Sequence, residues 1–333
     1  MNDPRILVTG GSGLLGSYML RWFKSRGYSN LSATFHKSDS IPSDLKDEIE
    51  WHLLNLPDIL DAYEIIRDKE WVVHTAAMVS YNPEDKYDLL NINKIGTEII
   101  VNACIAHHVD HLVYISSIAA LGKEMNHQTL DESNAWLQND YSTPYGLSKY
   151  LGELEVWRGG SEGLNVSVIL PSIILGTGDW KNSSLQLIDR VANKMPWYPG
   201  GQTGYVDVRD VVEFIGQLLV SKNIGERWLL NGVNMSYKDI YHLIAEKLGL
   251  KKNFREAPEW LARSILFINN LSKGRWSVPD LVHQVYGTFS YDARKSLTVD
   301  GFQYRNVEKT VEEVVEVYLN KGGRKVLELG SRA

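Results

Sequence analysis

The sequence has one cysteine, Cys104, no excess of basic residues and no long apolar run. A single cysteine excludes an intramolecular disulfide and a thiolate metal cluster, so we expect Cys104 to be an ordinary packed residue. The 35 Lys and Arg residues against 41 Asp and Glu give a formal net charge of −6. This balance disfavours nucleic acid and anionic membranes as partners, because both recruit basic patches. It favours a small-molecule substrate.

Apolar runs are short along the whole chain. The first begins at Ile6 and ends at Gly10, too short for the apolar part of a signal peptide. No run approaches the roughly 20 apolar residues that cross a bilayer. We therefore expect a cytoplasmic protein without a membrane partner.

The first half of the chain alternates between short apolar runs and segments with helical periodicity. Strands are expected near 5–8, 31–35, 50–54, 71–76, 111–116 and 165–170, and helices from Leu14 to Phe23 and near 57–67, 86–106 and 144–157. This alternation predicts an α/β fold of the Rossmann type, with a doubly wound parallel sheet and helices on both faces.

A glycine-rich loop lies where the first strand meets the first helix. A dinucleotide pyrophosphate must approach backbone N–H groups at a helix N-terminus, and a Cβ at the closest points would block it. The spacing fits T-G-x-x-G-x-x-G counted from Thr9 and G-x-G-x-x-G counted from Gly11, and both place the ligand at the same site. The predicted dinucleotide contacts are Gly10, Gly13, Leu14, Leu15 and Gly16.

Beyond Pro171 the pattern is less regular. Short strands are expected around 205–206 and 227–230, and helices around 182–194, 208–220, 237–248, 258–271 and 307–320. We assign residues 1–175 to the dinucleotide-binding Rossmann domain and 176–333 to a smaller, mostly helical substrate lobe. No linker separates the halves, so we expect close packing, with segments such as 205–230 returning to the Rossmann domain.

The residues after the second strand bear on the choice of dinucleotide. An acid there would bind the ribose hydroxyls of NAD, but the sequence has His36 and Lys37. A cation suits the 2′-phosphate of NADP, which a carboxylate would repel. We therefore predict NADP, with NAD as the alternative. The simpler interpretation of Lys37 is a solvated loop residue without a role in cofactor binding.

Tyr145 and Lys149 are four residues apart and share a helix face, with Ser142 or Thr143 as the cap of that helix. A phenol has a pKa near 10, and an adjacent ammonium lowers it, which would make Tyr145 a usable acid/base. Ser116 and Ser117 follow the fifth strand, at the sheet edge where α/β proteins bind ligands. A serine hydroxyl there could stabilise charge on a reacting oxygen.

Several motifs together resemble the extended short-chain dehydrogenase/reductase family, also catalogued as NAD-dependent epimerases and dehydratases. The likeness runs along nearly the whole chain. Its motifs are T-G-G-S-G-L-L-G at 9–16, V-V-H-T-A-A at 72–77, N-x-x-G-T at 93–97, S-S-I-A-A-L-G at 116–122, Y-G-L-S-K at 145–149, L-P-S-I-I-L-G at 170–176 and Y-V-D-V-R-D-V at 205–211.

The resemblance implies roles for individual residues. Tyr145 would be the catalytic acid/base, Lys149 would lower its pKa, and Ser117, with Ser116 as the alternative, would polarise the substrate oxygen. Asn93 would support the active-site helix or a water, although it could equally hold a helix kink. The further cofactor contacts implied are Ala76 and Ala77 at the adenosine ribose, Pro171 and Ile173 at the nicotinamide, and Asn93, Tyr145 and Lys149.

Two positions depart from the family pattern. Where many members place an acid beside the adenine, this chain has Asn55 followed by Leu56, and an asparagine can still hydrogen-bond there. Leu170-Pro171 stands where many sugar-nucleotide members have Arg-Pro. The second departure weakens the hypothesis of a sugar-nucleotide substrate.

The leading hypothesis is reversible hydride transfer between NADP(H) and a secondary alcohol or ketone on a small, partly apolar substrate, as in dihydroflavonol-reductase-like members. A nucleotide-sugar epimerase or dehydratase with retained NAD is the alternative, and a non-catalytic dinucleotide sensor is a third. The resemblance also implies a homodimer through 86–106 and 144–157. We expect no metal, because His107, His108 and His111 fit a helix C-terminus better than a ligand set.

Overall fold

The computed structural model describes residues 3–124, 128–178, 180, 185–193, 197–221, 224–251, 254–264 and 281–320. Its central layer is a seven-stranded sheet in the order β11-β7-β5-β4-β1-β2-β3, with every neighbouring pair parallel. The strands are β1 (Ile6–Thr9), β2 (Leu31–Phe35), β3 (Glu50–Leu53), β4 (Trp71–His74), β5 (His111–Ile115), β7 (Val166–Pro171) and β11 (Glu226–Leu230).

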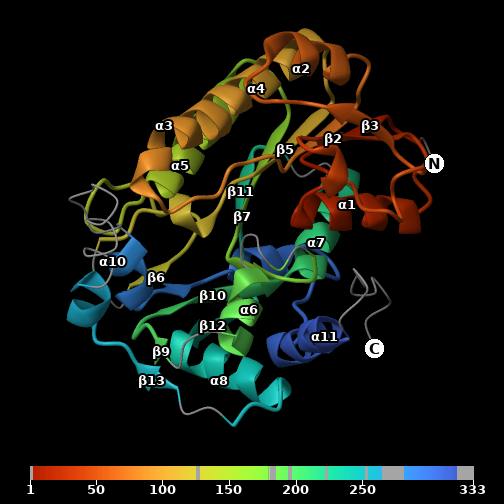
Figure 1. The fold of residues 1–333 in the computed structure, drawn as a ribbon. Helices are drawn as coiled ribbons and strands as arrows, with labels where there is room; N and C mark the ends of the chain where they lie inside the picture. Colours follow the sequence, from red (N-terminus) through yellow and green to blue (C-terminus); the bar gives the residue numbers. More distant parts are fainter. Residues whose placement is uncertain are drawn as a thin grey trace.

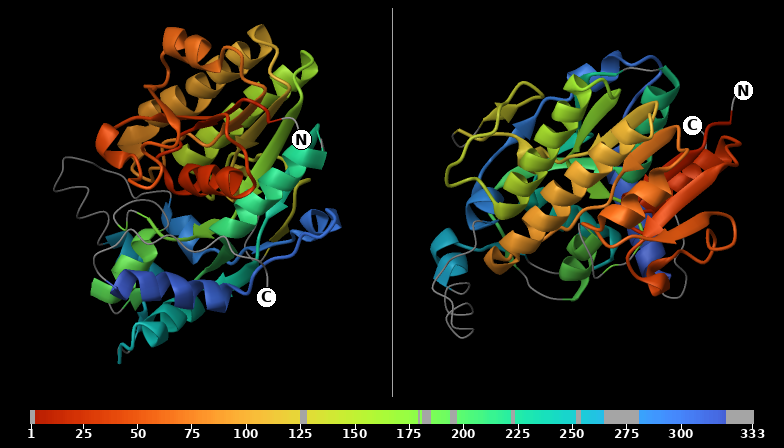
Figure 2. Two further views of the ribbon diagram at one scale, coloured as in Figure 1. Left: turned by 90° about the vertical axis from the view of Figure 1, so that its right-hand side faces the viewer. Right: turned by 90° about the horizontal axis from the view of Figure 1, so that it is seen from above.

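This strand order confirms the predicted doubly wound Rossmann fold. On one face lie α2 (Ile59–Ile66), α3 (Lys86–Leu89), α4 (Gly96–Ala106) and α5 (Pro144–Ser161), and on the other lie α1 (Leu14–Ser25) and α7 (Val208–Ser221) (Figures 1 and 2). The strands at the centre of the sheet therefore bury both of their faces, whereas the edge strand β3 has no fully buried residue. In β1, Ile6 and Val8 join one apolar core and Leu7 joins the other, as alternation along a strand requires.

A smaller lobe lies below the sheet (Figure 1). Its three-stranded sheet has the order β12-β10-β8, in which β10 (Gln202–Asp207) runs parallel to β8 (Ile173–Leu175) and antiparallel to β12 (Val233–Ser236). Further elements are α6 (Gln186–Asn193), α8 (Tyr237–Lys247), α10 (Leu281–Tyr286), α11 (Val307–Leu319) and the short strands β6 (Thr129–Leu130), β9 (Trp197–Tyr198), β13 (Arg255–Glu256) and β14 (Ser290–Tyr291).

The structure differs from the sequence-based expectation in a few elements. The single helix predicted over 86–106 is interrupted by a π-helical turn at Leu90–Ile95. The strands β8 and β12 were not predicted, because each is too short to show a clear alternation. Parts of two predicted helices, 182–184 with 194 and 265–271, lie outside the described residues. None of the described helices has the length and apolar character to span a bilayer.

Candidate active site

The glycine loop joins β1 to α1 in a geometry that requires glycine. Gly10 has a φ of +67°, and a Cβ there would lie 2.8 Å from backbone atoms of Ala76. A Cβ on Gly16 would strike the Gly10 carbonyl oxygen and lie 2.8 Å from the Gly11 Cα. The first turn of α1 therefore packs directly on the loop.

The N-terminus of α1 has no side-chain cap, because its N-cap residue is Gly13. The N–H groups of the first helical turn have no intrahelical partners and so suit a phosphate. Leu15 is buried in the core, and the Leu14 side chain lies beside Gly176 and Gly178. The predicted phosphate site thus consists of backbone N–H groups, and Leu14 and Leu15 pack beside it.

The ends of β2 and β4 hold the loop in place. The backbone N–H of Gly10 donates to Thr34 Oγ1 at 2.9 Å, and the Thr75 hydroxyl donates to the Thr9 carbonyl at 2.6 Å. Thr9 Oγ1 lies 2.7 Å from Nδ1 of the buried His74. Burial lowers the pKa of His74 to about 3, with Lys149 as the second cause, so this histidine is neutral at physiological pH.

The residues predicted near the adenosine lie at one edge of this loop. His36 and Lys37 are exposed after β2, and His36 Nδ1 lies 2.7 Å from Asn55 Oδ1. Among the described residues, no ion pair involves Lys37. Leu56 packs near Gly96, Ala76 is half-buried and Ala77 is exposed after β4. Lys37 is therefore an exposed cation at the end of β2 that is available to bind an anion.

Asn93 lies in the π-helical turn and is buried. Its Nδ2 donates to the Met78 carbonyl and to Ser148 Oγ, both at 2.9 Å, and its Oδ1 accepts from the Met78 N–H at 2.8 Å. These bonds join the loop after β4 to α5. They favour a positioning role for Asn93 over the direct cofactor contact that we had predicted.

The two serines after β5 have different partners. Ser116 is buried and donates to Glu153 Oε2 at 3.0 Å. Ser117 caps the short 3-10 helix Ile118–Ala120 by accepting from the Ala119 N–H at 3.1 Å, and its side chain contributes to lowering the pKa of Tyr145. The geometry therefore favours Ser117 over Ser116 as the partner of the phenol.

Tyr145 and Lys149 lie in the first turns of α5. Thr143 caps this helix by accepting from the Gly146 N–H at 3.0 Å, and Pro144 occupies its first turn. Both functional side chains are buried, and Lys149 Nζ lies 4.3 Å from the centre of the Tyr114 ring. The helix thus presents phenol and amine from one buried face.

The electrostatics of the pair differ from the expectation. Burial raises the pKa of Tyr145 above its ordinary value, Tyr81 adds to the rise, and the hydrogen bond with Ser117 lowers it in part. Burial also lowers the pKa of Lys149 to about 7, against the opposing effect of Glu153. The predicted net lowering at Tyr145 by Lys149 is wrong for this structure, because burial and Tyr81 raise the pKa and Ser117 offsets only part of the rise.

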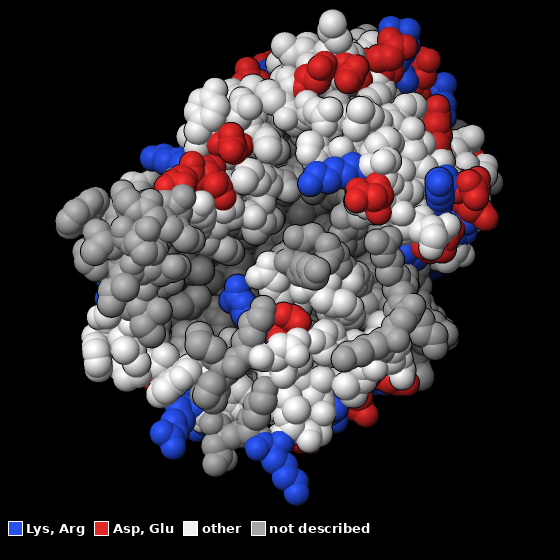
Figure 3. Space-filling view, in the orientation of Figure 1, with Lys and Arg blue, Asp and Glu red and all other residues white. Residues whose placement is uncertain are grey.

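Tyr81, in the loop after β4, lies between Tyr145 and two tyrosines of the second lobe. The Tyr81 ring meets Tyr145 edge-on at 5.9 Å, and the Tyr81 phenol interacts electrostatically with Tyr237 after β12 and with Tyr291 of β14. Arg190 of α6 also acts on Tyr237. The surface is hollowed between the sheet domain and the lobe below it (Figure 3). These residues form a wall that is both aromatic and polar.

The segment that leaves β7 completes the site. Pro171 is buried as the last residue of β7, Ile173 opens β8 and is half-buried, and the Ser172 hydroxyl between them is buried without a hydrogen-bond partner. Among the described residues, no three His, Cys, Asp or Glu side chains gather as a metal ion would require.

Sequence reasoning missed Glu153 and Tyr81. Glu153 follows Lys149 by four residues, so helical spacing could have placed it on the same face. Tyr81 lies in a loop that has no periodicity, and its approach to Tyr145 depends on tertiary structure.

Comparison with known proteins finds a matching family and similar sequences. The model of the NAD dependent epimerase/dehydratase family matches residues 6–229. A putative dihydroflavonol 4-reductase of Synechocystis sp. is 27% identical over 329 residues, which cover 95% of this chain and 94% of that protein.

Two solved structures share the fold. The crystal structure of gox2253 superposes with a TM-score of 0.82 at 23% identity and covers 96% of this chain and 99% of its own. The UDP-glucose 4-epimerase of Thermus thermophilus, in complex with NAD, has a TM-score of 0.76 at 18% identity and covers 96% and 100% of the two chains.

Proposed function

Because the chain belongs to the NAD-dependent epimerase/dehydratase family, we propose that it is an NAD(P)-dependent oxidoreductase that interconverts a carbonyl and a secondary alcohol. Ser117, Tyr145 and Lys149 form its reaction centre. The proximity of the Ser117 side chain to the Tyr145 phenol, whose pKa it lowers in part, carries this proposal. It brings together a proton donor and a second hydroxyl at the carboxyl end of β5, where sheets of this kind bind ligands.

The raised pKa of Tyr145 suits carbonyl reduction. A phenol with such a pKa is protonated at neutral pH, so it can give its proton to the carbonyl oxygen of the substrate. The Ser117 O–H donates a hydrogen bond to the same oxygen and stabilises the developing charge. The reduced nicotinamide supplies the hydride when bound. Lys149, when protonated, stabilises the phenolate that forms at Tyr145.

The loop geometry fits the dinucleotide. Gly10, Gly13 and Gly16 hold the pyrophosphate at the uncapped N-terminus of α1, with Leu14 and Leu15 beside it. NADP is the proposed form, because Lys37 is an exposed cation at the end of β2 where NAD-binding proteins place an acid. His36, Asn55, Leu56, Ala76 and Ala77 complete the proposed adenosine side, and Pro171 and Ile173 the nicotinamide side.

The substrate is proposed to be small and partly apolar, and to bind between the sheet domain, residues 1–175, and the lobe, residues 176–333. Support comes from the aromatic wall at Tyr81, Tyr237 and Tyr291 and from the relative described as a putative dihydroflavonol 4-reductase. A sugar-nucleotide epimerase is the second candidate, because the Thermus thermophilus structure of that enzyme shares the fold.

A substrate panel separates the two candidates. The purified protein is incubated with NADPH or NADH and with apolar ketones, aldehydes or nucleotide sugars, while the absorbance of the reduced nicotinamide is followed. Net oxidation of NADPH by a ketone is the expected result. Isomerised or dehydrated nucleotide sugar without net oxidation would assign the epimerase or dehydratase instead.

A further inference from the structure

Glu153 is a buried carboxylate that neither the cofactor loop nor the proton transfer uses. It lies on α5 one helical turn after Lys149, and its residue is 4% exposed. A carboxylate at such a position requires partners, because burying an unpaired charge costs several kcal/mol.

Three elements supply these partners. Ser116 at the end of β5 donates to Oε2 at 3.0 Å, and Trp157 Nε1 of α5 donates to Oε1 at 3.1 Å. Arg227 of β11 forms an ion pair, with its Nε 2.7 Å from Oε1. Glu153 therefore joins the strand end that carries Ser117 to the helix that carries Tyr145 and Lys149.

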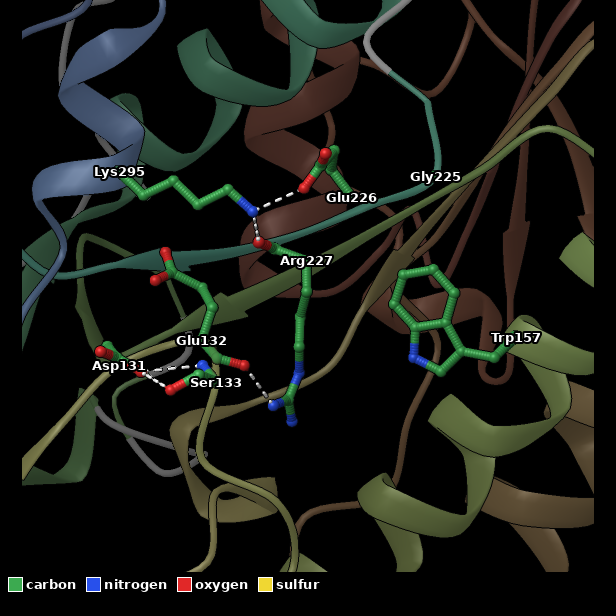
Figure 4. A pocket seen from close by; sticks show the side chains of 8 residues that line it. All are labelled: Asp131, Glu132, Ser133, Trp157, Gly225, Glu226, Arg227 and Lys295. Atoms are coloured by element: carbon green, nitrogen blue, oxygen red, sulfur yellow. Dashed lines mark hydrogen bonds and ion pairs between the residues drawn. The ribbon is translucent and has the colours of Figure 1, made fainter.

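Arg227 is itself held in one orientation. Its Nη1 donates to the carbonyl of Glu132 at 2.9 Å (Figure 4) and to the carbonyl of Asn134 at 3.1 Å. Figure 4 shows the Arg227 side chain directed away from Lys295, along the wall of a pocket that Trp157 also lines. The guanidinium thus reaches Glu153 from a fixed position.

Three groups of the described residues lie around Lys149. Glu153 acts on it from α5, the neutral His74 on β4 is itself affected by the Lys149 charge, and the Tyr114 ring of β5 lies 4.3 Å from its Nζ. Of these three groups, Glu153 is the one that carries negative charge. It opposes the burial that lowers the pKa of Lys149 to about 7.

We propose that Glu153 is a positioning residue that favours the charged form of Lys149 and, through Ser116, fixes the strand end that carries Ser117. This inference rests on the proposed function for its catalytic consequence. An opposite charge close by shifts a pKa by about 1–3 units. Without Glu153, the pKa of Lys149 would fall further below its ordinary value, so a smaller fraction of Lys149 would be protonated at neutral pH to stabilise the phenolate of Tyr145.

The test compares pH profiles of kcat/KM for NADPH-dependent ketone reduction. The E153Q variant keeps the size of the side chain and removes its charge, and the expected result is an alkaline limb displaced to lower pH by about one unit or more. E153D, which restores the charge, is expected to move the limb back. Glu155→Gln is the control, because Glu155 lies on the same helix but pairs with Lys94 and Arg158.

An alkaline limb that E153Q leaves in place would overturn the proposal, as would equal displacement by E155Q. If E153Q does not fold, the double variant E153Q/R227M replaces it, because removing both partners leaves no unpaired buried charge. The same displacement is expected of the double variant.

A direct titration separates this inference from the proposed function. Lysine labelled with 13C at Cε is followed by NMR from pH 5 to 10, with K149M to assign the resonance. The Lys149 pKa is expected to be lower in E153Q than in the wild type. If E153Q lowers the Lys149 pKa but the wild type reduces no carbonyl, only the proposed function is refuted. If the wild type is active but E153Q leaves the Lys149 pKa unchanged, the role of Glu153 is refuted.

Discussion

Lys37 is the residue whose charge bears most directly on cofactor choice. Lys37→Glu places a carboxylate beside the proposed 2′-phosphate, so we predict that the Kd for NADPH rises by about tenfold or more, as loss of a charge-assisted contact requires, while that for NADH changes little. Fluorescence titration of the reduced nicotinamide measures both. Lys46→Glu makes the same charge change at another exposed lysine and should affect neither. Equal weakening of the two dinucleotides by Lys37→Glu would refute the phosphate role.

Lys123 is a buried lysine that lies over the Phe289 ring, with its Nζ 5.0 Å from the ring centre. Burial lowers its pKa to about 8, below the value near 10.4 of an unfolded chain. Between these two pH values the unfolded chain binds more protons, so the contribution of Lys123 to the free energy of unfolding rises with pH.

We therefore predict that Lys123→Met stabilises the protein at pH 7 by up to about 3 kcal/mol and that the gain shrinks as the pH approaches 10. Urea unfolding at the two pH values measures this difference. Lys46→Met removes an exposed charge and should give a small change at both. A stabilisation by Lys123→Met that grows with pH would contradict the lowered pKa of Lys123.

At the scale of elements, the junction of β1 and α1 leaves little space for a side chain larger than hydrogen. A methyl group on Gly16 would meet backbone atoms of Gly10 and Gly11, which cannot rotate away as a side chain can. Gly16→Ala is predicted to lower the free energy of unfolding by about 1–3 kcal/mol and to abolish dinucleotide binding. Thermal unfolding and NADPH titration measure the two effects, with Ser25→Ala, exposed in the same helix, as the control. Unchanged NADPH affinity in Gly16→Ala would place the cofactor elsewhere.

Elements with a strong local pattern could be predicted from the sequence. The strands of the central sheet and the glycine loop follow from apolar runs and from the backbone approach that a phosphate needs. The π-helical turn could not be predicted, because it depends on bonds from Asn93 to Met78 and Ser148. Helical spacing could have placed Glu153 on the face of Lys149, but it could not predict the ion pair with Arg227, which lies 74 residues away. The pKa of Tyr145 was mispredicted because burial is a property of the folded chain.

For the whole molecule, the family likeness implies a homodimer through the helices of one sheet face. Ile99, Ile100 and Ala103 of α4 are buried within the single chain, so they are not available for a partner. Two apolar side chains on neighbouring helices are available, because Tyr87 of α3 is 77% exposed and Leu154 of α5 is 44% exposed. A second copy of the chain would cover both.

We predict that Leu154→Glu converts a dimer into a monomer, because the dimer interface would bury an unpaired carboxylate. Sedimentation velocity measures the mass of the particle. Leu60→Glu, at a residue of α2 that is 82% exposed, is the matched control and should leave the mass unchanged. A dimer that survives Leu154→Glu would exclude this helix face as the interface.

The fold brings Tyr145, Ser117 and the glycine loop to one edge of the sheet, and Tyr145 is the group on which the proposed chemistry depends. Tyr145→Phe removes only its hydroxyl group. The most direct test measures NADPH affinity and turnover of a confirmed ketone substrate in this variant. We predict unchanged affinity and a kcat lower by about 100-fold or more, as expected for the loss of a general acid. Turnover at the wild-type rate would contradict the proposed mechanism.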